Sequence, residues 1–552
     1  MACAALSVRA SVRRSRRGLG VQARCESLPA LLQRASLSAA AAARSHGCHL
    51  RGSGVALGLP SRWSLQWDAG GRSFAERVRV AQLDLRGAHD AATGDSWQTD
   101  LSGLATRLRE GDDAHDRAVL CTLVRTGQWA AAALEGHLEC SRESTGVLGL
   151  SLPGSPVVGR LWLHDVAGGA TPLRLELTLH SGGSESWSWA HWPTRAVHTQ
   201  ATGQTSDFTA SVSDEPETAE APPQSLEEAL AAPSEEEAAP FPFQSAAVEV
   251  ARSPGAHFLV LATLGGTPAW LVLDPCCDTG ALTRAAATSA AWEAVGEQRV
   301  HALGGAACAP LRRGGPGLGV LQFGGLRLPL TTPHLELSLD GLGLQAPQGA
   351  AVAGLLGGAA LRRCVLELHA PRRVPGARDA PRLRALVHPP GGYSPPPRVA
   401  VSWQRMRFID GAPHVRAEVR LEEGTDAPAH AGWYRLALGV GGTALLLSNA
   451  TAQAMRFSST VAPLQPGGTM AGPGEGRARM ALLQEGELLS GRVASVELVG
   501  ASFRFARAIV HAVDPQDLQL SQRCAGLLCA DLFRGCTLVL DWANERLAVV
   551  SE

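Results

Sequence analysis

Two segments in the C-terminal half of the chain repeat each other, and this repeat constrains the fold more than any other feature. Residues 353–368 read AGLLGGAALRRCVLEL and residues 525–540 read AGLLCADLFRGCTLVL, with Ala, Gly, Leu, Leu, Arg, Cys, Leu and Leu in step without a gap. Such self-similarity indicates two copies of one folding unit. We therefore expect two tandem lobes, residues 244–374 and 399–552, joined by a Pro-rich surface connector at residues 375–398.

A candidate active-site loop precedes the first repeated segment. Residues 270–283 read WLVLDPCCDTGALT, an apolar run followed by two carboxylates and then Thr279 and Gly280. The apolar run at residues 271–273 is typical of a buried strand. Gly280 permits the sharp turn that would lift the Asp278 side chain toward a neighbouring lobe.

This loop and the repeated segments resemble those of retropepsin-like and pepsin-like aspartic peptidases. Asp278-Thr279-Gly280 matches the active-site loop of that family, and Leu355-Leu356-Gly357 matches the segment that supports it. Leu527-Leu528-Cys529 matches except that Cys stands where Gly is expected. The resemblance covers residues 244–552. It implies a mainly β fold of tandem retropepsin-like acid-protease lobes. It also implies that the protein acts on a peptide or protein substrate and needs no cofactor. No Cys or His spacing indicates a metal site.

The chemistry of that family needs two such carboxylates facing each other. Two carboxylates about 3 Å apart share one proton, so that one activates a water as a base while the other acts as an acid. The Thr279 hydroxyl and the Gly280 turn favour Asp278 as the catalytic carboxylate of the first lobe. Asp274, which directly follows the apolar run, is the alternative. A third interpretation is that Asp274-Pro275 begins an ordinary turn, capped by Asp278.

The second lobe offers no carboxylate at the position that the sequence alignment predicts. Gly441-Gly442-Thr443 aligns with Gly265-Gly266-Thr267, which places Ser448 and Asn449 where the second Asp is expected. A serine hydroxyl cannot share a proton with Asp278 near neutral pH.

Two functions therefore remain open at this stage. The first is an aspartic-type endopeptidase whose second carboxylate comes from a homodimer, because symmetric association brings two copies of one surface together. The second is a non-catalytic pseudo-peptidase that binds a peptide, an apolar ligand or a protein partner.

Residues 26–192 have the pattern of an α+β domain. A helical segment is followed by short segments of alternating polarity separated by Gly-rich turns, which indicates antiparallel strands. In outline this domain resembles the helix-plus-half-barrel domain of bacterial lipoprotein carriers. Its tryptophans either fill an ordinary core or line an apolar pocket: Trp63, Trp67, Trp97, Trp129, Trp162, Trp187 and Trp189.

The remaining segments differ in composition from these domains. Residues 193–243 are rich in Asp, Glu, Ala, Pro and Ser, which predicts a disordered acidic linker. Residues 1–25 contain several Arg and Ser and no acidic residue, which predicts a transit peptide. The absence of Lys and the heavy use of Ala, Gly and Arg favour the chloroplast, with the mitochondrion as the alternative. The sequence contains no apolar run long enough for a transmembrane segment. The net charge of −1, with scattered Arg, does not predict a nucleic-acid surface.

Overall fold

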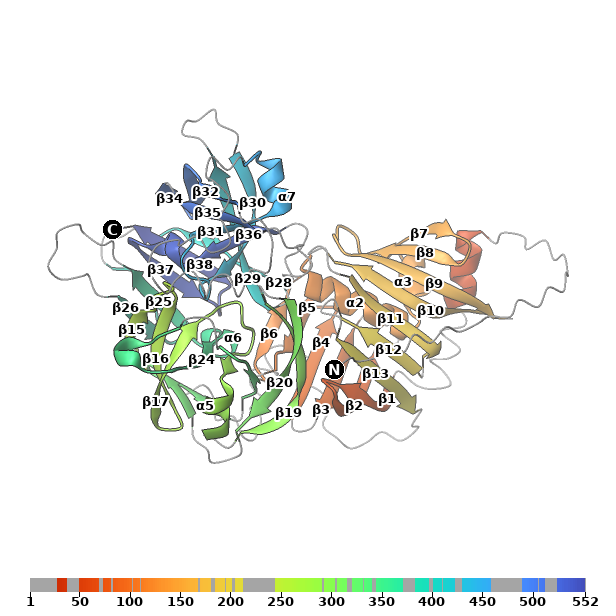
Figure 1. Ribbon diagram of the computed structural model, residues 1–552. Coiled ribbons are helices and arrows are strands. Elements are labelled where there is room, and N and C mark those ends of the chain that lie inside the picture. The colour runs from red at the N-terminus through yellow and green to blue at the C-terminus, as the bar shows by residue number, and fades with distance from the viewer. Residues whose placement is uncertain are drawn as a thin grey trace, which may run out of the picture.

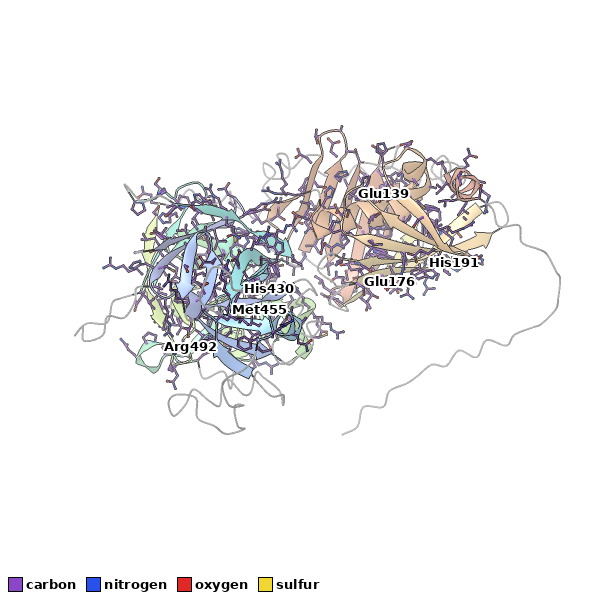
Figure 2. The ribbon with its side chains drawn as sticks, turned by 90° about the horizontal axis from the view of Figure 1, so that it is seen from above. Glu139, Glu176, His191, His430, Met455 and Arg492 are labelled. Atoms are coloured by element: carbon purple, nitrogen blue, oxygen red, sulfur yellow. The ribbon has the colours of Figure 1, made fainter. Side chains whose placement is uncertain are left out.

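The computed structural model describes residues 27–36, 49–68, 73–80, 83–101, 103–109, 111–166, 169–179, 184–193, 195–200, 204–211, 244–289, 292–302, 305–314, 320–330, 332–339, 344–370, 383–396, 401–409, 411–421, 429–457, 489–504, 506–511 and 524–551. The predicted transit peptide and most of the predicted linker lie outside these residues. The described chain is mainly β, with an N-terminal domain beside a double lobe (Figures 1 and 2). In Figure 2, Glu139 and His191 mark the N-terminal domain, and His430 and Arg492 mark the second lobe.

The N-terminal domain is built on one antiparallel sheet of thirteen strands. The strands pair in chain order on either side of a β1–β13 pairing, so that β6 and β7 are the two edges. The strands are β1 (His49–Ala56), β2 (Leu59–Trp67), β3 (Phe74–Val80), β4 (Leu83–Asp90), β5 (Asp95–Thr99), β6 (Ala105–Leu108), β7 (Glu139–Ser144), β8 (Val147–Ser151), β9 (Val158–Val166), β10 (Gly169–Thr178), β11 (Ser184–His191), β12 (Arg195–Thr199) and β13 (Thr205–Ser211). Helices at residues 28–36, α2 (Asp113–Arg125) and α3 (Trp129–Leu134) complete the half-barrel.

This sheet extends further along the chain than the sequence predicts. Strands β12 and β13 lie beyond residue 192, in the range expected to be linker, so that boundary is corrected to Ser211. The two strands bury few apolar side chains, chiefly Ala196 and Phe208. Their polar composition hid the alternation that identifies the other strands.

The apolar faces of the helices and of the sheet share one core. Leu120 and Val124 of α2 pack in the same buried cluster as Leu65 of β2 and Leu175 of β10. Five of the tryptophans in question are buried side chains of this domain: Trp63, Trp97, Trp129, Trp187 and Trp189. The structure therefore favours the core interpretation of these residues over the pocket.

The first lobe contains a ten-stranded sheet. Its strands are β15 (Val250–Arg252), β16 (Phe258–Leu264), β17 (Thr267–Leu273), β18 (Ala281–Leu282), β19 (Glu293–Ala302), β20 (Gly305–Arg313), β21 (Val320–Phe323), β22 (Leu326–Pro329), β23 (His334–Glu336) and β24 (Val352–Leu356). Short helices lie between them or follow them: α5 (Arg284–Ser289), the 3-10 turn η1 (Pro347–Gly349) and α6 (Gly358–Leu361).

The second lobe contains a nine-stranded sheet of related topology. Its strands are β28 (Arg407–Ile409), β29 (Ala412–Arg420), β30 (Ala429–Ala437), β31 (Leu445–Ser448), β32 (Leu489–Arg492), β33 (Ser495–Leu498), β34 (Ala501–Arg504), β35 (Arg507–His511) and β36 (Cys524–Cys529). Helix α7 (Asn449–Ala454) follows β31, and the 3-10 turn η3 (Ala530–Phe533) follows β36.

The repeated segments occupy equivalent strands in the two lobes. β24 pairs in parallel with β17 and antiparallel with β18. β36 pairs in parallel with β30 and antiparallel with β31. Each repeated segment thus lies between the two strands that flank its lobe's central loop.

A six-stranded sheet joins the lobes. Its strands are β14 (Ala246–Val248), β25 (Val365–Ala370), β26 (Arg384–His388), β27 (Trp403–Arg405), β37 (Cys536–Asp541) and β38 (Arg546–Ser551). Strand β26 lies inside the range predicted as a surface connector, so that prediction is corrected for residues 384–388. The alternation of Ala385 and Val387, both buried, is short enough to be masked by the Pro and Arg residues around it.

Candidate functional site

The candidate loop, residues 274–280, directly follows β17 at the junction of the two lobes. The amide N–H of Asp274 continues the β17–β24 ladder by donating to the carbonyl oxygen of Leu356 at 3.0 Å. In the second lobe, the β30–β36 ladder places Ala437 opposite Cys529. Because β24 and β36 are the repeated segments, Ala437 is the equivalent of Asp274 in strand register.

Asp274 lies against the second lobe. Its Oδ1 accepts a hydrogen bond from the amide of Cys276 at 3.1 Å, and the amide of Gly439 also donates to its carboxyl group. A Cβ atom on Gly439 would lie only 2.6 Å from Asp274 Cγ. Burial raises the pKa of Asp274, against the lowering by these two amides and by the charge of Arg435.

Asp278 lies at the other end of the loop and is bound by an arginine. Arg362, just after α6, donates from Nη2 to Asp278 Oδ1 and from Nη1 to Asp100 Oδ2, the latter at 2.5 Å. The side chains of Arg362 and Asp100 are each 9% exposed, and that of Asp278 is 30% exposed. Burial alone would lower the pKa of Arg362, but the two carboxylates raise it above its usual range. Asp278, Arg362 and Asp100 therefore form a network of three charged side chains. Asp100 belongs to the N-terminal domain.

Thr279 and Gly280 complete the loop. Thr279 is buried, and its hydroxyl donates to the carbonyl oxygen of Gly280 at 3.0 Å. Gly280 has φ 114°, and a Cβ there would lie 3.1 Å from the ring of His334 and 3.3 Å from the carbonyl oxygen of Leu355. The turn therefore requires Gly for both conformation and space.

The structure places Ser448 and Asn449 away from the position that the sequence alignment gave them. Ser448 ends β31, and its hydroxyl accepts from the amide of Thr451 at 3.1 Å as the N-cap of α7, whose first residue is Asn449. Strand β31 corresponds to β18, which follows the candidate loop. The segment that corresponds to the candidate loop is residues 437–444, between β30 and β31.

A partly buried arginine of the second lobe holds the centre of the candidate loop. Arg435 donates from Nε to the Sγ atom of Cys276 at 3.1 Å and from Nη2 to its carbonyl oxygen at 3.3 Å. The Cys276 thiol in turn donates to the carbonyl oxygen of Leu436 at 3.0 Å. Burial raises the pKa of Cys276 to about 12 in spite of Arg435. This thiol is thus a structural group and not a thiolate nucleophile near neutral pH.

Sequence reasoning missed the two arginines and Asp100. Arg362 carried a usable signal, because it is one of the residues conserved in step between the two repeated segments, where its counterpart is Arg534. Arg435 and Asp100 lie in strand and turn segments with no distinguishing pattern, and only the fold brings them to the loop.

The described residues show no grouping of three His, Cys, Asp or Glu side chains that could hold a metal ion. Within the same residues, no helix is long and apolar enough to cross a membrane.

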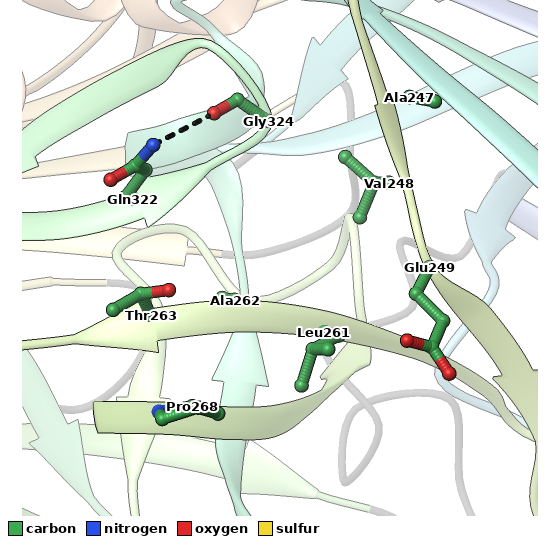
Figure 3. Close-up of a pocket in the computed structure, with 9 residues that line it drawn as sticks. All are labelled: Ala247, Val248, Glu249, Leu261, Ala262, Thr263, Pro268, Gln322 and Gly324. Atoms are coloured by element: carbon green, nitrogen blue, oxygen red, sulfur yellow. Dashed lines mark hydrogen bonds between the residues drawn. The ribbon is translucent and has the colours of Figure 1, made fainter. Parts of the chain in front are cut away.

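A pocket of about 250 Å³ opens on the first lobe (Figure 3), where the Gln322 side chain donates to the carbonyl oxygen of Gly324 at 3.4 Å. Neither Asp274 nor Asp278 belongs to its lining, which consists of Ala247, Val248, Glu249, Leu261, Ala262, Thr263, Pro268, Gln322 and Gly324. Among the residues that line this pocket, Glu249 is the single titratable side chain, so the lobe junction remains the candidate site.

No protein-family model matches this chain, and no curated protein matches it. Among solved structures, the aspartic proteinase from Irpex lacteus is 10% identical with a TM-score of 0.36, covering 56% of this chain and 97% of that chain. Basic 7S globulin from soybean is 9% identical with a TM-score of 0.33, covering 56% of this chain and 96% of that chain.

Proposed function

We propose that this chain is a non-catalytic pseudo-peptidase, in which the junction of two peptidase-like lobes binds a protein segment and does not cleave it. One observation carries the proposal. The loop that faces Asp274, residues 437–444, reads ALGVGGTA and contains no carboxylate. A single carboxylate can accept a proton from water, but no partner acid is then placed to protonate the carbonyl oxygen.

The geometry around Asp274 also leaves no room for a side chain on Gly439, the residue that lies against its carboxyl group. Gly439 approaches so closely that even a methyl group would overlap the carboxyl carbon of Asp274. The second lobe of the same chain therefore covers this side of Asp274, where a carboxylate from a homodimer partner would otherwise face it. This argues against the endopeptidase assembled from two chains.

Asp278 is equally unsuited to general acid–base chemistry. Its carboxylate is occupied by Arg362, and a Cβ on Gly411 would lie 2.5 Å from its Oδ1 atom. An attacking water needs a carboxylate oxygen that is free to accept its hydrogen bond, whereas Oδ1 of Asp278 already accepts from the Arg362 guanidinium.

A cleavage assay tests the non-catalytic part of the proposal. Full-length protein is incubated with a peptide library from pH 3 to pH 8 over a hundred-fold range of protein concentration, and products are detected by mass spectrometry. We expect no cleavage above background, and the same result for Asp274→Ala and Asp278→Ala. Cleavage that disappears in either variant would establish an endopeptidase, and a rate that rises with the square of concentration would establish the dimeric form.

A further inference from the structure

One turn of the N-terminal domain reaches the candidate loop. Asp100 lies between β5 and β6, where its amide donates to the carbonyl oxygen of Leu104 at 3.0 Å and its Oδ1 accepts from the Leu104 amide at 3.1 Å. Its Oδ2 is the partner of Arg362. The backbone of the turn therefore fixes the carboxylate in the position that meets the guanidinium.

The residue that follows Asp100 enters an apolar cluster of the first lobe. Leu101 packs against this cluster together with Cys277 of the candidate loop. The lobe contributes the buried side chains Ala281, Val295, Ala309, Leu311 and Leu335. An anion-binding guanidinium and an apolar surface thus lie next to each other, and the dipeptide Asp100-Leu101 occupies both.

Arg362 is held in place without help from the N-terminal domain. Its Nη2 atom binds Asp278 and also donates to the carbonyl oxygen of Gly411 at 3.4 Å, so that Nη1 is left to point at Asp100. The repeat counterpart Arg534 is 55% exposed and pairs with Asp531 three residues earlier. Of the two repeat-equivalent arginines, Arg362 is therefore the one whose guanidinium is buried and directed at the N-terminal domain.

We propose that Arg362 and the adjoining apolar cluster form a binding site for an acidic protein segment in which Asp is followed by Leu, and that the chain's own Asp100-Leu101 fills this site. This inference rests on the proposed function, for which it names the ligand class. A second segment of this kind must compete with a tethered copy, whose effective concentration is on the order of millimolar. The site is thus self-occupied until the β5–β6 turn is displaced.

Other contacts hold the N-terminal domain in place when this turn is altered. Arg109 pairs with Glu545 at 2.8 Å, and the amide of Glu297 in β19 donates to the carbonyl oxygen of Leu57 at 2.9 Å. Removal of the Asp100 and Leu101 side chains therefore leaves the domains joined and opens the site.

The test measures binding of a fluorescein-labelled peptide that copies residues 97–104, WQTDLSGL, to the full-length chain by fluorescence anisotropy. We expect the variant with Asp100→Asn and Leu101→Ala to bind the peptide at least ten-fold more tightly than the wild type. Addition of Arg362→Gln to that variant should abolish binding, and a peptide with Asn in place of its Asp should bind at least ten-fold more weakly. The matched control is Asp95→Asn at the start of β5, the strand that precedes Asp100, where an exposed carboxylate pairs with Arg107 and the peptide affinity should stay at the wild-type value.

Equal peptide affinity for the wild type and the double variant, or binding that is insensitive to Arg362→Gln, would overturn the inference. Hydrogen–deuterium exchange gives a measurement that needs no variant. Saturating peptide should speed amide exchange in β5 and β6 of the wild type, and unchanged exchange would also overturn it. Mass spectrometry of the same samples separates the two proposals, because hydrolysis of the peptide contradicts only the non-catalytic function.

Discussion

The central loops of the two lobes occupy equivalent places and have opposite compositions. In the first lobe, residues 274–280 read DPCCDTG, with two carboxylates and two thiols. In the second lobe, residues 437–444 read ALGVGGTA, with three glycines and no charge. The polar loop is therefore covered by a loop with almost no side chains, and the two backbones come close together.

At the lobe junction, the charged residue that the second lobe contributes, Arg435, lies on strand β30 and not in the loop that follows it. Arg435 of β30 is opposite Leu527, as Val272 of β17 is opposite Leu355, so a partly buried cation stands where the first lobe has an apolar side chain. Burial raises the pKa of Asp274, and the charge of Arg435, which binds Cys276, partly counteracts that rise. An arrangement with one acid and one base stabilises the association of the lobes, whereas two acids would share a proton and stay reactive.

The largest expected difference between the lobes concerns the two repeat-equivalent arginines. Arg362→Gln should lower the free energy of unfolding by about 3 kcal/mol, because it leaves the largely buried carboxylates of Asp100 and Asp278 without a cation. Arg534→Gln should change it by about 0.5 kcal/mol or less, because its pair with Asp531 is exposed to solvent. Urea unfolding followed by tryptophan fluorescence measures both.

Equal losses for the two arginines would contradict this asymmetry. A double-mutant cycle sharpens the result, because Asp100→Asn in the Arg362→Gln background should restore part of the lost stability. Side chains that share one buried network are coupled in this way.

The close approach of the two loops gives the second expected effect. Gly439→Ala should destabilise the protein by about 2 to 3 kcal/mol, because its new methyl group overlaps the Asp274 carboxyl group. Gly266→Ala in the β16–β17 turn is the control: it has φ 87° and open space around it, so only the backbone term of about 1 kcal/mol applies. Thermal melts of both variants measure the difference.

The same pair of residues can be tested from the other side. In an Asp274→Gly background, Gly439→Ala should cost clearly less, because all the overlapping side-chain atoms of residue 274, including Cβ, are gone. An unchanged cost there would mean that the two loops do not meet as the structure shows.

Much of the fold could be predicted from local patterns. The repeat at residues 353–368 and 525–540 gave two strands, β24 and β36, with the same neighbours in each lobe. Alternating segments of the N-terminal domain matched strands on both sides of its β1–β13 pairing, such as β2, β3, β10 and β11. Strands such as β12, β13 and β26 were missed because few of their side chains are apolar and buried.

The candidate site could be predicted only in part, because its essential contacts are remote in sequence. Asp278 and Arg362 are 84 residues apart, and Arg362 and Asp100 are 262 residues apart. The sequence alignment also matched Gly441-Gly442-Thr443 with Gly265-Gly266-Thr267. In the structure, Gly265 and Gly266 form the turn between β16 and β17. Gly441-Gly442-Thr443 instead belongs to the loop between β30 and β31. Because the same Gly-Gly-Thr triplet occurs at two places that are not equivalent, the alignment assigned Ser448 to the position that corresponds to Asp278.

The smallest expected effect concerns the pH dependence of stability, to which one buried histidine in each lobe should contribute equally. His334 of the first lobe and His414 of the second are buried, and each ring Nδ1 lies 2.9 Å from a backbone carbonyl oxygen two residues earlier. Burial lowers the pKa of His334 to about 4 and that of His414 to about 3, the latter with help from the charge of Arg435. Both imidazoles are therefore neutral in the folded chain at pH 5.

The sign of the pH dependence follows from these two pKa values. As the pH falls below about 6.5, the unfolded chain takes up a proton on each imidazole but the folded chain does not, so acid favours unfolding. Between pH 6.5 and pH 5, His414→Asn and His334→Asn should each remove about 1 to 2 kcal/mol of the acid-induced loss of stability, and by equal amounts. Urea unfolding at the two pH values measures this, and Asn keeps a donor for the carbonyl oxygen. A difference between the two variants in this range would show that one imidazole is already charged in the folded state, and therefore that the lobes differ in their cores as well as in their loops.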